Sequence, residues 1–281
     1  MTKEELVILM GELERVFSTV RLVDASLNIE YTLNDAGMLR EEPYKCYAVW
    51  GKNDRCENCI SAKGLTTKSK MTKFEFIDHD IYYLVSMYVE IEDEPYMLEM
   101  ISQVTDETLF GAYGKNEFVT SITEYNRKMY TDVLTGAYNR RYYEEQLEAL
   151  CQWYAMAMVD VDDFKQINDI HGHEAGDLAL RAIADAMSSC VEGRDAVVRY
   201  GGDEFLIVFR DISQEGFEEK LETIRKKVND IVLESFPDIR LSVSIGGKYN
   251  PSKSKNVIRE ADAMLYKAKI DKNCVQWKAD I

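Results

Sequence analysis

A hairpin signature lies at residues 196–209, AVVRYGGDEFLIVF. Ala196–Tyr200 and Phe205–Phe209 are apolar runs of strand length, and Gly201-Gly202-Asp203-Glu204 separates them. Glycine tolerates the backbone angles of a tight turn, so the pattern predicts two antiparallel strands with two carboxylates at the turn. The missing side chains of Gly201 and Gly202 would also let the backbone come close to a bound molecule.

The segments on both sides extend this hairpin into a domain. Trp153–Val159 is a nearly unbroken apolar run that ends in Asp160, which is typical of a buried central strand. Gly176-Asp177 is expected to open a helix, because apolar residues recur after it at helical spacing. A polar helix (214–233), a strand (241–245) and a last helix (256–271) follow. This order of elements predicts an α+β fold of the ferredoxin-like or polymerase-palm type.

Three carboxylates, those of Asp160, Asp203 and Glu204, are expected to converge, because the central strand and the hairpin should be neighbours. At about 4 Å and an intermediate dielectric, each pair of such groups repels by a few kcal/mol. Divalent cations remove that repulsion, and hard oxygen ligands favour Mg²⁺ or Mn²⁺. The sequence therefore predicts a metal-binding cluster; the alternative is that these acids are solvated strand ends.

Several blocks of the C-terminal half occur in the order of one known family. Arg199-Tyr-Gly-Gly-Asp-Glu-Phe205 resembles the signature of the GGDEF family, the diguanylate cyclases. The resemblance extends over residues 132–281. Its other blocks are Asp132–Arg141, Asp160–Asp169, Gly172-His173, Gly176-Asp177, Ser244–Gly246 and Ala261–Lys269.

The resemblance implies an activity: two GTP are condensed into cyclic di-GMP with release of two pyrophosphates. Each domain would hold one GTP, so catalysis would require a homodimer. By the same resemblance, Asp160, the Val161 carbonyl and Asp203 bind metal. Glu204 is then a second metal ligand or helps to deprotonate the 3′-hydroxyl. The residues expected to be catalytic are Asp160, Lys165, Asp203 and Glu204.

The resemblance also implies substrate contacts. Asn168 and Asp177 resemble the guanine-binding residues, since an amide and a carboxylate together match the edge of that base; the alternative for Asp177 is a helix N-cap. With an aspartate at position 177, the chain resembles those family members that use two GTP rather than one GTP and one ATP. Lys165 follows the first metal ligand, where the family binds the β- and γ-phosphates; the alternative is a solvated charge. The expected substrate contacts are Asp163, Phe164, Asn168, Asp177, Gly201, Gly202, Lys269 and Lys272.

Two positions depart from the family pattern. The Arg-x-x-Asp motif for product inhibition should end at Asp195, but its first position is Glu192. Glutamate repels a cyclic dinucleotide phosphate, and Arg194 stands one residue from the aspartate, which puts feedback inhibition at this site in doubt. After Lys269 the family has two residues and then Gly-Arg-Asn or Gly-Lys-Asn. The segment 270–273, Ile-Asp-Lys-Asn, is one residue shorter, and Lys272 is the candidate contact to the γ-phosphate.

The first 105 residues have a different pattern. Apolar residues at helical spacing predict a helix over 3–17. Strand-like runs lie on both sides of a loop-rich stretch (34–70), at 19–24, 28–32, 73–76, 81–91 and 96–104. A helix, a hairpin, a variable middle and a further meander resemble a PAS-type sensor domain.

The segment between the two halves favours a connector helix. Phe118, Ile122, Tyr125 and Met129 recur at spacings of three and four, and amphipathic helices of this kind often pair. Asp132, Asn139, Arg140 and Arg141 are expected to fasten this helix to the catalytic domain. The predicted organisation is a PAS-like sensor domain (1–105), a connector helix (106–131) and a GGDEF catalytic domain (132–281).

Three cysteines of the first half, Cys46, Cys56 and Cys59, are candidate metal ligands. The Cys-x-x-Cys pair could chelate Zn²⁺ or iron, with His79 as a candidate fourth ligand. Two alternatives remain: reduced cysteines in a small loop core, or a redox-active pair.

The chain of 281 residues has a formal net charge of −16, which disfavours a binder of nucleic-acid polymers. No apolar run approaches the roughly 20 residues of a membrane helix, and the N-terminus lacks the pattern of a signal peptide. The expectation is a cytoplasmic signalling enzyme without membrane insertion. The alternatives are a non-catalytic regulator that binds GTP or a cyclic dinucleotide, and a cyclase that joins different purines.

Overall fold

The computed structural model describes residues 1–52, 56, 59–77, 80–105, 114–147, 154–193, 195–250 and 256–279. The chain divides into two units, Met1–Glu124 and Tyr125–Ile281. In the described part of the chain, we find no helix long and apolar enough to cross a bilayer.

The N-terminal unit is built on one antiparallel sheet, in the order β3-β2-β1-β6-β5-β4. A first hairpin and a later meander therefore join through β1 and β6 at the centre of the sheet. The strands are β1 (Thr19–Asp24), β2 (Glu30–Leu33), β3 (Leu39–Glu41), β4 (Met71–Ile77), β5 (Asp80–Ile91) and β6 (Glu94–Gln103).

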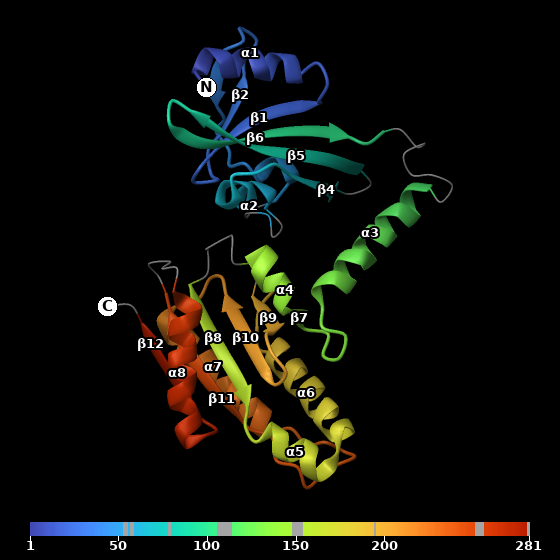
Figure 1. Ribbon diagram of the computed structural model, residues 1–281, viewed down its shortest axis with the longest axis vertical. Helices are drawn as coiled ribbons and strands as arrows, with labels where there is room; N and C mark the ends of the chain where they lie inside the picture. The colour runs from blue at the N-terminus through green and yellow to red at the C-terminus, as the bar shows by residue number, and fades with distance from the viewer. Residues whose placement is uncertain are drawn as a thin grey trace. The chain divides into compact units, whose positions relative to one another are not determined.

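Helices cover both faces of this sheet (Figure 1). Helix α1 (Lys3–Leu13) begins at a capping box formed by Thr2 and Glu5, and its buried side chains pack on one face. Helix α2 (Ile60–Thr67) packs on strands β4, β5 and β6, and the short η1 (Ala48–Trp50) precedes it. The unit is thus an α+β domain, as predicted.

Helix α3 (Gly114–Tyr130) lies within the predicted connector and has no buried residue. The ring of Phe118 lies 5.4 Å from that of Phe74 on β4, edge to face. The predicted connector residues 106–113 lie outside the described residues.

The C-terminal unit has a six-stranded sheet in the order β12-β11-β8-β10-β9-β7. Its inner four strands, β11-β8-β10-β9, are antiparallel and follow the ferredoxin-like order, which confirms the predicted fold class. Strand β7 pairs in parallel with β9 at one edge of the sheet, and β12 pairs in parallel with β11 at the other; neither edge strand was predicted from the sequence. The strands are β7 (Tyr138–Asn139), β8 (Ala155–Val161), β9 (Ala196–Arg199), β10 (Glu204–Phe209), β11 (Val243–Tyr249) and β12 (Val275–Ala279).

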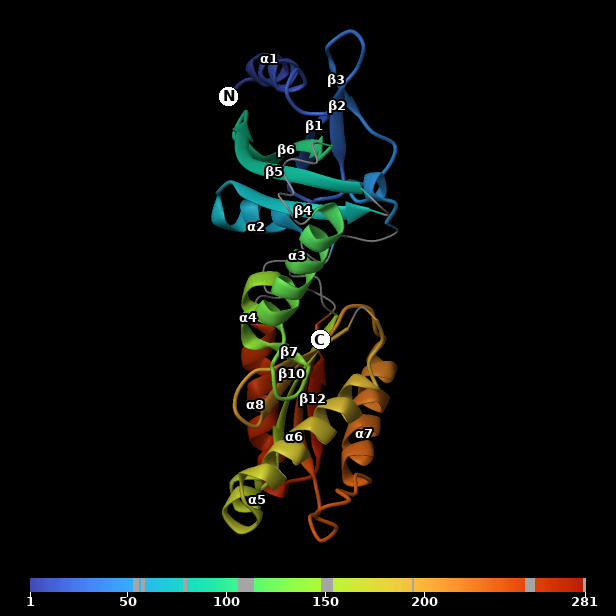
Figure 2. The ribbon, with the colours of Figure 1, turned by 90° about the vertical axis from the view of Figure 1, so that its right-hand side faces the viewer.

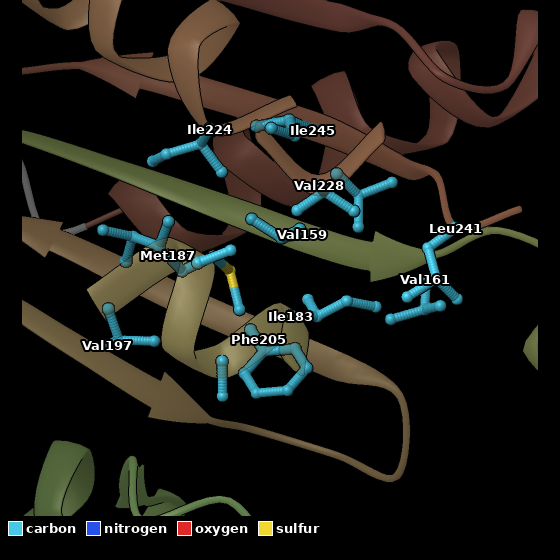
Figure 3. Close-up of a cluster of buried hydrophobic side chains, with 14 of the residues drawn as sticks. Val159, Val161, Ile183, Met187, Val197, Phe205, Ile224, Val228, Leu241 and Ile245 are labelled. Carbon is cyan, nitrogen blue, oxygen red and sulfur yellow. The ribbon is translucent and has the colours of Figure 1, made fainter. Parts of the chain in front are cut away.

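The helices of this unit lie on the two faces of the sheet, with α6 and α7 on one face and α8 on the other (Figures 1 and 2). Alternate residues of β8, such as Val159 and Val161, enter the core under α6 and α7, which leaves Asp160 on the α8 face. Figure 3 shows this core, with Val159, Val161, Ile183, Met187, Val197, Phe205, Ile224, Val228, Leu241 and Ile245 labelled. The helices are α4 (Arg140–Tyr142), the π-helical η3 (Tyr143–Leu147), α5 (Phe164–His171), α6 (His173–Ser188), α7 (Gln214–Asn229) and α8 (Val257–Asp271).

Several predicted bounds were wrong. The helix expected to open at Gly176-Asp177 begins at His173, because Gly172, at φ 84°, ends α5 and starts α6. The first helix ends at Leu13 rather than at residue 17, and α7 ends at Asn229 rather than at residue 233. The stretch expected to be loop-rich contains β3, η1 and α2.

Candidate active site

The predicted hairpin forms, with β9 and β10 paired from Phe205 opposite Arg199. The amides of Tyr200 and Gly201 both donate to the Glu204 carbonyl, at 2.9 and 3.1 Å, and close the turn. A Cβ on Gly201 would lie 2.8 Å from Glu204 Oε2, whereas one on Gly202 would meet nothing within 4 Å. Gly201 therefore leaves room for the glutamate, and Gly202 leaves an open approach to the turn.

The three predicted acidic residues lie at one end of the sheet, where β8 ends and β10 begins. Asp160 and Glu204 are direct partners in the antiparallel register, so their side chains share the α8 face of the sheet. The Val161 amide donates to the Asp203 carbonyl at 3.2 Å, which holds the third carboxylate at the same strand end. Like charges directly opposite each other destabilise a sheet, so this pairing needs a compensating positive charge.

Lys269 of α8 supplies part of that charge. Its Nζ lies 2.7 Å from Asp160 Oδ2. Burial raises the pKa of Asp160, the charges of Asp203 and Glu204 add to this rise, and Lys269 opposes it. Burial lowers the pKa of Lys269, but its hydrogen bond to Asp160 and the charges of all three acids outweigh this, so the pKa is raised. One ammonium thus faces three acids.

This excess of carboxylates fits a divalent cation with oxygen ligands, Mg²⁺ or Mn²⁺. Asp160, Asp203, Glu204 and the Val161 carbonyl are the residues that would hold it. Among the described residues, no three His, Cys, Asp or Glu side chains are already gathered at metal-binding distance.

Arg199 is a site residue whose role the sequence did not reveal. Its Nη2 and Nε donate to the Gly202 carbonyl at 2.7 and 3.1 Å, and its Nη1 donates to Asp132 Oδ1 at 3.0 Å. Asp132 follows α3, and Asn139 donates to the carbonyls of Met129 and Thr131 at the end of that helix. Arg199 therefore links the carboxylate turn to the end of the connector. The sequence signal for this contact was the opposite charge of Arg199 and Asp132, which lie in two separate motifs of the family.

The predicted guanine-binding residues come from two adjoining helices. Asn168 is half-buried on α5, and a Cβ on Gly176 would lie only 2.1 Å from its Oδ1 and 3.2 Å from Phe164 Cζ. The absence of a side chain at Gly176 thus leaves the room that the Asn168 amide occupies. Asp177 is exposed and lies inside α6, whose N-cap is Gly172, so the N-cap alternative for Asp177 is wrong.

The predicted phosphate contacts lie where β8 leads into α5. Asp163 has a left-handed backbone, at φ 54°, and is followed by Phe164 and the exposed Lys165. Lys272 Nζ donates to both Asp163 carboxylate oxygens, at 2.7 and 2.9 Å. The shorter loop after α8 therefore still brings a cation to this segment.

The degenerate inhibition motif borders a cleft of about 940 Å³ that runs along α7. Glu192 accepts from Lys220 at 3.4 Å, and Asp195 accepts from the backbone amides of Glu192 and Arg210. Both acids therefore already have partners inside the protein. Arg194 lies outside the described residues.

The three N-terminal cysteines line one cavity of about 20 Å³, the size of a water molecule, beside Arg21 and Glu99. Burial raises the pKa of Cys46 to about 12, and its thiol donates to the Leu27 carbonyl at 3.2 Å. Cys59 caps α2 by accepting from the Ala62 amide at 3.4 Å. These contacts are those of protonated core thiols, and the predicted zinc or iron is not confirmed. His79 lies outside the described residues.

Comparisons with known proteins agree with this geometry. Residues 129–274 match the family model described as diguanylate cyclase, GGDEF domain. The chain is 31% identical over 175 residues to the probable diguanylate cyclase DgcC of Escherichia coli, which covers 57% of this chain and 47% of that protein. It is 37% identical over 163 residues to the E. coli diguanylate cyclase DosC, covering 53% and 35%. The chain thus spans less than half the length of these two relatives.

A solved structure of a GGDEF domain is also similar to this chain. The coiled coil and GGDEF domain of DgcB from Caulobacter crescentus, in complex with c-di-GMP, matches with a TM-score of 0.54 and 28% identity. The match covers 58% of this chain and 93% of that one. Because the family model spans more than half of the 281 residues and includes the carboxylate hairpin, this chain belongs to the GGDEF family of diguanylate cyclases.

Proposed function

We propose that the protein condenses two GTP into cyclic di-GMP. The 3′-hydroxyl of each GTP attacks the α-phosphate of the other. Two phosphodiester bonds form, two α–β phosphoanhydride bonds break, and two pyrophosphates and two protons leave. The observation that carries the proposal is the direct pairing of Asp160 with Glu204, with Asp203 at the same strand end.

The chain's own residues would bind and orient the substrate. Asn168 and Asp177 would hold guanine, Lys165 and the amides of Asp163-Phe164 would meet the β- and γ-phosphates, and Gly202 would let the nucleotide approach the turn. A Mg²⁺ or Mn²⁺ held by the carboxylates would stabilise charge on the phosphates and lower the pKa of the attacking hydroxyl. One site supplies half of the reaction, so we propose that a homodimer is required.

The test is pyrophosphate release by the full chain with Mg²⁺ and GTP, ATP, or both. GTP alone should support release, and ATP alone should not. Binding of GTP without any release, from protein confirmed to be dimeric, would instead support a non-catalytic regulator.

Gly176→Ala should weaken GTP use without unfolding the domain. The new methyl group would displace the Asn168 amide, from which its Cβ would lie 2.1 Å, while alanine favours the α6 helix. We expect the KM for GTP to rise by about tenfold, on the scale of a lost base contact. Gly11→Ala is the control, because its Cβ on α1 meets nothing within 4 Å. An unchanged KM would remove Asn168 from the base site.

We also propose that cyclic di-GMP does not inhibit through the Glu192–Asp195 turn. Glu192 would repel a phosphate, and Lys220, the nearby cation, is already paired with it. Initial rates should therefore not fall when cyclic di-GMP is added at the start. Inhibition that disappears in Glu192→Ala would contradict this.

For the N-terminal unit we propose a regulatory role: with the connector helix, it would set how often two catalytic domains meet. The predicted zinc or iron at Cys46, Cys56 and Cys59 stays a prediction. Metal analysis of protein purified without chelator, compared with Cys56→Ser, tests it. A stoichiometric metal lost in the variant would support the site, and metal-free wild-type protein would exclude it.

A further inference from the structure

The loop that follows α8, residues Lys272–Cys274, has an unusual backbone. Lys272 has φ 55° and ψ 163°, and Asn273 has φ 45°. L-residues rarely adopt such angles, and the region of Lys272 is ordinarily left to glycine. A strained conformation of this kind persists only where surrounding contacts fix it.

Contacts from three separate segments of the chain fix this loop. The Asn273 amide donates to Asp162 Oδ2 at 2.9 Å. Asn273 Oδ1 accepts from Arg225 and Asn229 of α7, each at 3.0 Å. The Cys274 carbonyl accepts from the Ile245 amide of β11 at 2.9 Å.

Asp162 is the buried member of this set and is 8% exposed. Its Oδ1 accepts from the Ser244 hydroxyl and its Oδ2 from the Ser242 hydroxyl, each at 2.7 Å. Its own amide donates to the Ser242 carbonyl at 3.0 Å. Three donors thus converge on a group that only accepts. An asparagine would turn an NH₂ toward at least one of these donors.

The side chain that the loop presents is that of Lys272. Its ammonium donates to both oxygens of Asp163, the neighbour of Asp162, on the segment proposed to meet the β- and γ-phosphates. Asp162 follows Asp160 by two residues and holds the loop that carries the lysine. It ties the chain's last loop to the strand end that carries the acids.

We propose that Asp162 is a positioning residue of the triphosphate subsite, which holds the strained Lys272–Asn273 backbone so that Lys272 meets the terminal phosphates. The inference rests on the proposed function. It assigns a role to a buried acid that is not among the residues proposed to hold the base or the metal, and it makes Lys272 the group through which that acid acts.

The test is calorimetric binding to the full chain with Mg²⁺. The ligands are the GTP analogue with a methylene α,β-bridge, which cannot release pyrophosphate, and GMP, which lacks the terminal phosphates. Asp162→Asn and Lys272→Ala should each weaken binding of the analogue by about tenfold, the scale of one charge-assisted hydrogen bond. The affinity for GMP should change less than about twofold. The double variant should bind the analogue no more weakly than Lys272→Ala alone.

Asp24→Asn is the matched control, because this carboxylate also accepts backbone amides, from Ser26, Asn28 and Ile29, but in the N-terminal unit. It should leave both affinities unchanged. Equal weakening of the analogue and GMP by Asp162→Asn, or additive losses in the double variant, would overturn the proposal. If Asp162→Asn does not fold, unchanged binding by Lys272→Ala, which alters an exposed side chain, would overturn it as well. Wild-type protein that binds neither ligand would instead contradict the proposed function.

Discussion

Asp203→Asn is expected to lower pyrophosphate release from GTP by at least about a hundredfold, the scale of losing a group that stabilises developing charge. The change keeps the size of the side chain and the backbone carbonyl that accepts from the Val161 amide. It removes one of the charges that raise the pKa of Asp160. Thermal unfolding should therefore occur at the same or a slightly higher temperature, because repulsion at the strand end falls.

Asp185→Asn is the control for this experiment. It alters an exposed acid on α6 by the same substitution and should leave turnover unchanged. Turnover retained in Asp203→Asn, with normal unfolding, would remove the proposed metal role from this aspartate.

Arg21→Met should destabilise the N-terminal unit by about 3–5 kcal/mol, the usual result of removing one partner of a buried ion pair. Arg21 is 1% exposed, and its guanidinium donates to Glu30 and Glu99, at 2.7 Å each, and to the Cys46 carbonyl. Methionine would leave two buried carboxylates without their counter-charge. Urea unfolding followed by tryptophan fluorescence measures the loss, since Trp50 lies against the guanidinium.

The loss should depend on pH. Burial raises the pKa of Glu30, and Arg21 opposes that rise. A carboxyl whose pKa is raised by folding costs stability as the pH rises through its folded-state value. Without Arg21 the pKa of Glu30 rises further, so the destabilisation should be larger at pH 8 than at pH 5.

Arg40→Met is the control, because Arg40 pairs with Glu42 with its own side chain largely exposed. It should change the unfolding midpoint little. A small effect of Arg21→Met, or one that is equal at both pH values, would contradict the account of this buried cluster.

The sequence predicted the parts of the fold that depend on local pattern. The apolar run before Asp160 and the glycines of the hairpin were enough to place β8, β9 and β10, because burial and turn chemistry act on neighbouring residues. Helix α5 and its break from α6 were not predicted; in the structure the positive φ of Gly172 separates the two helices. The parallel pairing of β12 with β11 was not predicted, because the pattern within a strand does not show which strand it will pair with.

The contacts that organise the site were harder to predict. Arg199 reaches Asp132 across 67 positions, and Asp162 reaches the Asn273 amide across 111. Motif resemblance located Asp160, Asn168 and Lys269 as candidates. Spacing and periodicity do not show which distant residues will form a hydrogen bond, and the opposite charges of Arg199 and Asp132 did not by themselves select that pair. Gly176 was predicted to start a helix. In the structure it lies inside α6, and its lack of a side chain leaves room for the side chain of Asn168.

The central claim is that this chain joins two GTP into cyclic di-GMP. The most direct test incubates the purified full chain with GTP, ATP and Mg²⁺, at a concentration where sedimentation confirms a dimer, and identifies the products by mass spectrometry. The account predicts cyclic di-GMP as the cyclic product, with two pyrophosphates for each molecule formed. No cyclic dinucleotide from the confirmed dimer, or a product that contains adenine as well as guanine, would contradict it.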